Sequence, residues 1–155
     1  MAKFIKKTQY SYKYKKKEIN GEMVISLKRF EGQYSKAQFR LDSVVMRDMV
    51  PFMPMVAGQF VNVTKAMSAS IAGSGKVVAA APPFGRFLYE GQVMVGVKSG
   101  SPFAMPGEQK RAINQQLQYT KTAHPGATDH WFDAAKRKHG KKWVEITKQT
   151  AGGGR

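Results

Sequence analysis

Prolines and glycines between Val50 and Gly91 fix where this chain can be helical. Proline lacks a backbone N–H donor and forces the residue before it towards an extended conformation, so Pro51 and Pro54 must end any helix that precedes them. We expect this turn to matter for folding, together with Gly58. Gly58→Val would be costly if that glycine has a positive φ, which β-branched residues strongly disfavour.

The centre of this stretch predicts a β-hairpin followed by a short helix. Apolar residues alternate with serines from Met67 to Ile71, residues 73–75 read Gly-Ser-Gly, and residues 76–81 return as a second strand. The pair Pro82-Pro83 then opens a short helix that Gly91 ends. The central hairpin is thus expected to supply the main sheet.

A long helix is predicted before the turn. From Phe30 to Met49 the apolar residues recur at helical spacing, with charged residues on the opposite side. We expect its apolar stripe to pack on the central hairpin. The predicted fold class is α+β: a small antiparallel sheet packed against a long helix and a C-terminal helix, with an extended N-terminal arm and a long loop.

The second half of the chain predicts a strand pair joined by a long loop. Residues 93–97 alternate as in a strand, and Leu117 with Tyr119 could pair back with them. The loop between them, Lys98 to Ala112, contains prolines and glycines, and its tip carries Phe103 and Met105. Long loops in small domains are usually functional or disordered, and exposed apolar residues favour a docking role.

A closing helix is predicted near Trp131, with Thr128 or Asp129 as its N-cap and some interruption at Gly140. Trp131 and Trp143 stand among small apolar residues. Core packing is therefore favoured over stacking of these rings on nucleic-acid bases.

The first residues predict a basic arm. Tyr10, Tyr12 and Tyr14 alternate as in a strand, Asn20-Gly21 resembles a turn, and residues 23–27 form a returning strand. A strand this charged would not fold alone, so the arm is either disordered or adds to a partner's sheet. The tyrosines favour the second alternative and are candidate docking residues.

Length and composition point to one domain with arms. A chain of 155 residues with 42% hydrophobic content can form one modest core. We therefore divide it into a basic arm (1–21), a single α+β domain (22–149) and a flexible tail (150–155). No cysteine is present, which excludes disulfides and thiolate metal sites. No apolar run approaches the roughly 20 residues that span a bilayer, and no signal peptide is expected.

The formal net charge of +16 predicts attraction to polyanions such as nucleic acid. Most of the positive charge lies near the two ends of the chain. Lysine runs are also common on solvated surfaces or against acidic proteins, so these alternatives stay open. The candidates for facing DNA are Lys13, Lys15, Lys16, Lys17, Lys138, Lys141 and Lys142.

Two patterns in the sequence could indicate catalysis or nucleotide binding. Residues 73–76, Gly-Ser-Gly-Lys, resemble the end of a phosphate-binding loop, but Ser70 replaces the first glycine and Val77 replaces the final Ser or Thr. His130 and Asp133 could share a helix face.

The other histidines do not complete a site. His124 precedes a proline in a loop, and His139 lies more than a turn beyond His130. No catalytic, cofactor or metal site is predicted, and we expect a binding protein and not an enzyme.

A wider pattern links the two halves of the chain. Pro-Phe-Met-Pro at residues 51–54 is followed by Gly58, Phe60, the predicted hairpin, and PPFGRFLYEG. Together with HPGATDHWFDAAK near the C-terminus, this pattern resembles the minor capsid or head-tail connector proteins of long-tailed bacteriophages. The resemblance covers about Phe30 to Lys148. The basic arm and the segment from Lys98 to Ala112 depart from it.

The resemblance implies a structural protein of the virion neck, a tail-completion or head-completion component located at the head-tail junction after assembly in the host cytoplasm. Its partners would be copies of itself in a ring of six-fold or twelve-fold symmetry, adjacent portal, head-completion or tail proteins, and DNA passing through the channel. Neither a cofactor nor a membrane is expected. The alternatives are a stand-alone basic nucleic-acid-binding module and a small hydrolase that uses His130 and Asp133.

Overall fold

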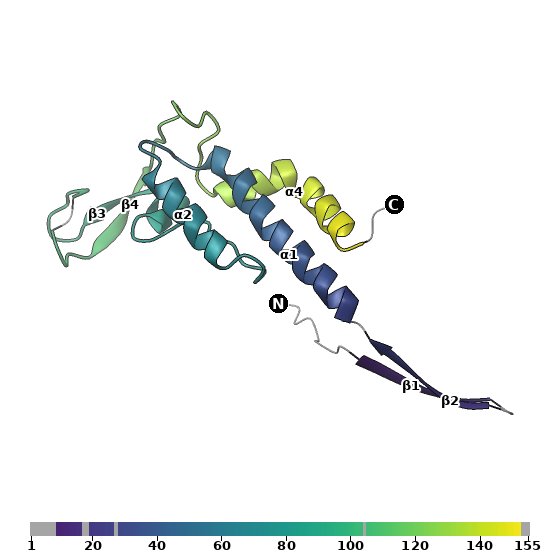
Figure 1. Cartoon of the computed structure of the whole chain (residues 1–155). Coiled ribbons are helices and arrows are strands. Elements are labelled where there is room, and N and C mark those ends of the chain that lie inside the picture. Colours follow the sequence, from purple (N-terminus) through teal and green to yellow (C-terminus); the bar gives the residue numbers. More distant parts are fainter. Residues whose placement is uncertain (1–8, 17–18, 27, 104, 153–155) are drawn as a thin grey trace.

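The molecule is elongated, with helices at its centre and a two-stranded hairpin at each end (Figure 1). The computed structural model describes residues 9–16, 19–26, 28–103 and 105–152, with side chains from Glu31 onward. The elements are β1 (Gln9–Lys16), β2 (Ile19–Ser26), α1 (Lys28–Met49), the 3-10 turn η1 (Val50–Phe52), α2 (Gln59–Ser70), α3 (Gly85–Glu90), β3 (Gln92–Gly96), β4 (Lys110–Gln116) and α4 (Trp131–Thr150). The predicted α+β class is confirmed.

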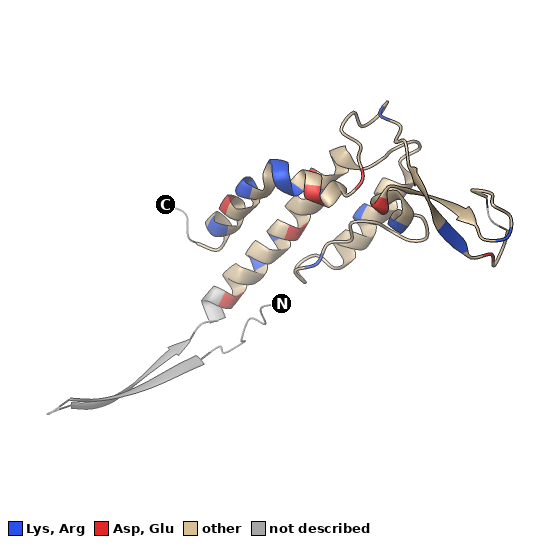
Figure 2. Ribbon diagram, turned by 180° about the vertical axis from the view of Figure 1, so that it is seen from behind, with Lys and Arg blue, Asp and Glu red and all other residues tan. Residues whose placement is uncertain are grey.

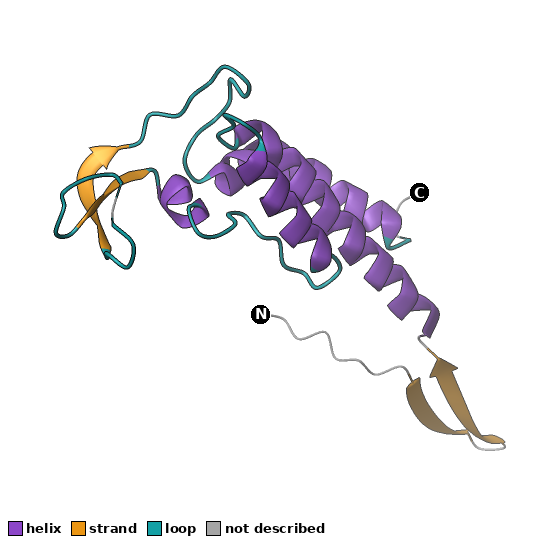
Figure 3. Ribbon diagram, turned by 60° about the vertical axis from the view of Figure 1, so that its left-hand side comes forward, coloured by secondary structure: helices purple, strands orange, loops and turns teal. Residues whose placement is uncertain are grey.

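The core lies between α1 and α4, which pack side by side (Figure 3). Met49 and Trp131 are completely buried in it, and burial of such large apolar side chains stabilises the fold by roughly 1.5 to 3 kcal/mol each. The indole N–H of Trp131 donates to the Ala79 carbonyl (2.8 Å), and that of Trp143 donates to the Asp48 carboxylate (2.9 Å). The prediction that both tryptophans pack in the core is confirmed.

The carboxyl of Asp48 is part of this core. Burial acts to raise its pKa, but the hydrogen bonds from Trp143 and Arg47 and the nearby positive charge outweigh that effect, and the pKa lies below its ordinary value. The Arg47 guanidinium lies 2.9 Å from the carboxylate. Asp48 is therefore held as an anion that fixes the ring of Trp143 against α1.

The predicted long helix is confirmed, and it ends where the prolines require. α1 stops at Met49, and the 3-10 turn that follows contains Pro51. Gly58 has a φ of 77° and caps the start of α2, so the expected left-handed backbone is present. The turn redirects the chain into a helix and not into a strand.

The predicted central hairpin is wrong. The segment from Met67 to Ser70 belongs to α2, and residues 71–81 form no strand. Alternating alanine and serine fits a helix as well as a strand, because alanine is the best helix former. α2 instead buries every third or fourth residue: Val61, Thr64 and Ser68.

Side-chain hydroxyls of α2 take the place of a second strand. The Ser68 hydroxyl donates to the Val78 carbonyl and accepts from the Val78 N–H, both at 2.9 Å. The Thr64 hydroxyl accepts from the Ala81 N–H at 3.2 Å. Backbone groups of the returning segment are thus satisfied without a ladder, and the apolar stripe of α1 packs mainly on α4 in place of a sheet.

The Gly-Ser-Gly turn binds the protein's own carboxylate. The buried Asp42 of α1 accepts from the N–H groups of Gly73 (2.8 Å) and Gly75 (3.1 Å), and from the Gln38 amide (2.7 Å). Both glycines have a positive φ, which turns their N–H groups towards one acceptor. The two glycines are therefore explained by a contact within the chain, which anchors this turn to α1.

The short helix and the second strand pair are present, but their bounds differ from the predicted ones. α3 ends at Glu90 and Gly91, with a φ of 69°, is its C-cap, so the predicted stop is confirmed, but the helix begins at Gly85 and not at Pro82-Pro83. The strand pair of β3 and β4 is antiparallel, but β4 begins at Lys110, inside the predicted loop, and ends before Leu117. Leu117 still donates its N–H to the Gly91 carbonyl (2.8 Å).

α4 also differs from its prediction at two points. His130 is the N-cap, with a φ of 41°, in place of Thr128 or Asp129. The Thr128 hydroxyl donates to Asp129 instead of capping the helix. α4 runs through Gly140 without interruption, because a single glycine costs only about 1 kcal/mol in a helix and packing on α1 outweighs it.

The N-terminal hairpin is present, with a different turn. β1 pairs with β2 from Gln9 opposite Ser26 to Lys16 opposite Ile19. Asn20-Gly21 therefore lies within β2, and the connection falls at residues 17–18, outside the described residues. None of the described helices is long and apolar enough to cross a membrane.

Candidate docking interface

The loop between β3 and β4, residues 97–109, is organised by one carboxylate. Glu108 accepts from the N–H groups of Lys98 (2.8 Å) and Ser99 (2.7 Å) on one arm of the loop. It also accepts from the N–H of Met105 (2.9 Å) near the tip, and from the Ser99 hydroxyl (3.0 Å). A single side chain thus joins both arms.

These donors favour the ionised form of the carboxyl. Hydrogen bonds from the backbone of Ser99, Met105 and Lys98 lower the pKa of Glu108 to about 2. The side chain approaches β3 closely, since a Cβ at Gly96 would lie 2.4 Å from a Glu108 carboxylate oxygen. Glycine at that position makes room for the carboxylate.

The tip of this loop is apolar and exposed, as the sequence predicts. Phe103 is 91% exposed and Met105 is 72% exposed. The Phe103 N–H donates to the Ser101 hydroxyl (3.1 Å), and the Lys110 ammonium donates to the Pro102 carbonyl (2.7 Å). The sequence predicts a mobile loop that orders on contact, whereas these bonds favour a loop that is held in shape beforehand.

Sequence reasoning missed Glu108. Its signal is modest: it is the only acidic residue between Glu90 and Asp129, and it lies in a segment rich in turn residues. A carboxylate in such a loop has many backbone N–H groups within reach. Which of them it binds depends on the path of the loop, which the sequence does not reveal.

The predicted docking tyrosines lie on β1, as do several of the predicted DNA-facing lysines. Figure 1 shows this hairpin projecting from the start of α1, away from β3 and β4. Lys17 and the side chains of β1 lie outside the described residues, so their contacts stay predictions. The residues concerned are Tyr10, Tyr12, Tyr14, Lys13, Lys15 and Lys16.

Basic residues recur along α4 (Figure 2), and its lysines and arginine are exposed. Its predicted DNA-facing residues Lys138, Lys141 and Lys142 are all exposed. The Lys138 ammonium lies 5.6 Å from the centre of the Phe52 ring, so part of its charge is directed at an aromatic face. The other cations of this helix are Lys136, Arg137 and Lys148, against Asp133 and Glu145.

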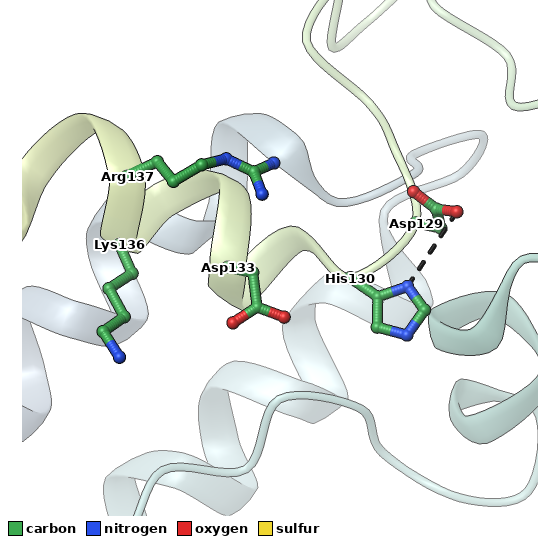
Figure 4. A pocket seen from close by; sticks show the side chains of 5 residues that line it. All are labelled: Asp129, His130, Asp133, Lys136 and Arg137. Carbon is green, nitrogen blue, oxygen red and sulfur yellow. Dashed lines mark ion pairs between the residues drawn. The ribbon is translucent and has the colours of Figure 1, made fainter.

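An open hollow of about 710 Å³ lies at the start of α4 (Figure 4). His130 and Asp133 both line it, so the structure brings this predicted pair to one surface. The His130 ring lies 3.7 Å from a Glu90 carboxylate oxygen and 3.9 Å from one of Asp129, which are ion pairs when the histidine is protonated. Lys136 and Arg137 complete the lining.

The remaining histidines lie elsewhere. His124 Nδ1 is 2.7 Å from the Met53 carbonyl, and His139 stacks edge-on against Phe52. Within the described part of the chain, no group of three or more potential metal ligands comes together. The hollow therefore gathers carboxylates, a histidine and two cations on one open surface.

Comparisons of this chain with family models, curated proteins and solved structures find no match.

Proposed function

We propose that this chain is a structural subunit of a bacteriophage neck, which assembles with copies of itself into a ring between portal and tail. The observation that carries the proposal is the preformed loop that exposes Phe103 and Met105. Burying such side chains contributes roughly 1.5 to 3 kcal/mol each. Because Glu108 already holds the loop, docking requires little further ordering of the backbone.

The shape of the molecule supports the same proposal. The β1–β2 hairpin and the β3–β4 hairpin project at opposite ends of the helical body (Figures 1 and 3). Each interface in a ring is heterologous and repeats until it closes, so one subunit needs a projecting element and a different receiving surface. A subunit with projections at both ends suits that requirement.

The phage setting comes from the resemblance of the sequence. Its motifs fall on the turn after α1, on the beginning of α2, on α3 and on the beginning of α4, and the hairpin that the pattern included is not formed. These elements surround the core and contain none of the exposed loop. The virion location and the adjacent portal, head-completion or tail proteins are therefore part of the proposal.

Size-exclusion chromatography with light scattering on the full chain, alone and with neighbouring connector proteins, tests this function. We expect assembly, and we expect Phe103→Ser with Met105→Ser to reduce it while the melting temperature stays nearly unchanged. The matched control replaces two exposed apolar residues elsewhere, Val56→Ser with Phe84→Ser. A chain that stays monomeric under all conditions contradicts the proposal, and a large stability loss would place the tip in the subunit's own core.

The basic face of α4 favours a second candidate, a nucleic-acid-binding module that acts as a monomer. Each phosphate contact adds about 0.9 to the salt dependence of duplex binding. Under this alternative, replacing Lys138, Lys141 and Lys142 with alanine would reduce the salt slope of DNA binding by roughly 2 to 3. Tight, salt-dependent binding by a monomer that never assembles would favour this function over the ring.

A further inference from the structure

A second apolar surface lies on α1, far from the β3–β4 loop. It is a groove of about 610 Å³ between the middle of α1 and the end of α4. Phe39 supplies its main apolar surface and is 56% exposed. The lining residues are Ser35, Lys36, Phe39, Arg40, Ser43 and Thr150.

The Gly-Ser-Gly turn packs against Phe39, the main apolar residue of the groove. The turn anchored on Asp42 runs along Phe39, since a Cβ at Gly73 would lie 3.8 Å from that side chain. The hydroxyls at its edge are engaged within their own helices. Ser43 donates to the Phe39 carbonyl and Thr150 donates to the Ile146 carbonyl, both at 2.8 Å. The groove therefore presents mainly apolar surface, with two cations at its rim.

The tip of the β3–β4 loop has the complementary chemistry. It carries two exposed apolar side chains, and the Glu108 carboxylate lies directly behind Met105, bound to its N–H. The groove offers an aromatic ring with Lys36 and Arg40 beside it. The Glu108 carboxylate beside Met105 is an anion that Lys36 and Arg40 can face, while the Lys110 ammonium of the same tip is already bound to the Pro102 carbonyl.

We propose that this groove receives the Phe103–Met105 tip of a second copy of the chain. The inference rests on the proposed ring and names the contact that would build it. The β3–β4 hairpin and the end of α4, which borders the groove, lie on opposite sides of the helical body in both views (Figures 1 and 3). Each pair of copies therefore leaves one free tip and one free groove, and addition continues until the ring closes.

The absence of native cysteines allows a direct test by disulfide trapping in the full-length chain. One preparation carries Met105→Cys and another carries Ser43→Cys. Disulfides form only where Cβ atoms approach within about 4.5 Å. We expect the mixture to give about tenfold more cross-linked dimer than either preparation alone. The control mixture pairs Met105→Cys with Val56→Cys, an exposed position away from the groove.

The outcomes separate this contact from other arrangements. Efficient cross-linking of Met105→Cys with itself would show a tip-to-tip contact and overturn the proposal, as would equal yields in the control mixture. Assembly seen by light scattering without the Met105–Ser43 cross-link would overturn this contact and leave the proposed ring intact. A monomeric chain without the cross-link would overturn both.

A double-mutant cycle gives an independent readout. Phe39→Ser and Phe103→Ser should each weaken self-association about tenfold or more, and together they should weaken it little further, since both remove one contact. Fully additive losses would show that the two side chains act at different interfaces.

Discussion

Gly85 is the residue at which the backbone leaves the least room. A Cβ there would lie 2.6 Å from the carbonyl carbon of Ala80 and 2.9 Å from its Cβ. Because the obstacle is backbone, it cannot move aside as a flexible side chain would. The start of α3 therefore requires a residue without a Cβ at position 85.

We expect Gly85→Ala to lower the free energy of unfolding by about 1 to 3 kcal/mol, the usual cost of overpacking. Urea denaturation measures this change. Gly32→Ala is the matched control, because no atom lies within 4 Å of its added Cβ. That change should stabilise α1 by up to about 1 kcal/mol. Equal stability of the two variants would mean that the chain at Ala80 shifts freely.

Substitutions of Gly58 measure the cost of a left-handed backbone conformation without a contribution from steric overlap. The φ of Gly58 is 77°, and the nearest atoms to an added Cβ are 3.9 Å away, so space does not limit substitution. Gly58→Val should cost about 1 to 2 kcal/mol through the left-handed conformation alone. Gly58→Asn should cost less, because asparagine tolerates this region. An unchanged melting temperature of the valine variant would mean that the backbone relaxes to a negative φ.

At the scale of elements, the β3–β4 loop should respond to acid. The folded-state pKa of Glu108 is about 2, below the ordinary value of 4.5. The stability that the ionised carboxylate contributes is therefore fully present above about pH 4.5 and is lost as the pH falls through 2. NMR titration of the Ser99 and Met105 amide signals, which report the folded state, should show a midpoint near pH 2.

Glu108→Gln provides the matching change at neutral pH. It replaces one acceptor oxygen with an NH₂ group, so a loop N–H loses its partner. The Ser99 and Met105 amide signals should then resemble those of the acidified protein, with α1 and α4 unaffected. Unchanged amide signals would show that the loop keeps its shape without this carboxylate.

The elements also show what the sequence can and cannot predict. The helix ending at Met49 and the burial of Trp131 follow from local signals, proline chemistry and apolar spacing. The helical conformation of the segment around Ser68 does not follow from local signals, because alternating small residues suit both a strand and a helix until their tertiary contacts are known. The outcome there depends on hydroxyls that reach Val78 and Ala81, contacts between residues ten or more apart.

The loop between β3 and β4 also combines features that the sequence predicts with features that it does not. The exposure of Phe103 and Met105 follows from their place among prolines and glycines. The role of Glu108 depends on how the two arms of the loop face each other, and the groove at Phe39 requires α1, α4 and the glycine turn together. Surfaces assembled from distant segments leave little local signal in a sequence.

At the scale of the whole molecule, the segment that contains β1, the first strand of the N-terminal hairpin, should be separable from the core. β1 pairs with β2, and the hairpin projects from the start of α1 (Figure 1). Deleting Met1 to Lys17 should leave cooperative unfolding, with a melting temperature changed by less than about 4 °C, while incorporation into particles falls. Differential scanning calorimetry and particle assembly measure the two effects.

The control for this deletion keeps the lysines and replaces Tyr10, Tyr12 and Tyr14 with serine. A matching loss of incorporation would assign the effect to the tyrosines, and normal incorporation would assign it to the basic charge. Loss of cooperative unfolding in the truncated chain would show instead that the arm belongs to the core.

The packing of α1 on α4 also sets an order of events during synthesis. The partner of α1 lies at Trp131–Thr150, so the apolar face of the first long helix stays uncovered until the ribosome has made almost all of the described chain. Contacts this distant in sequence close a large loop and form late. The groove beside Phe39 needs Thr150 as well, so under the proposed contact a nascent chain has no complete groove to receive the tip of a neighbour.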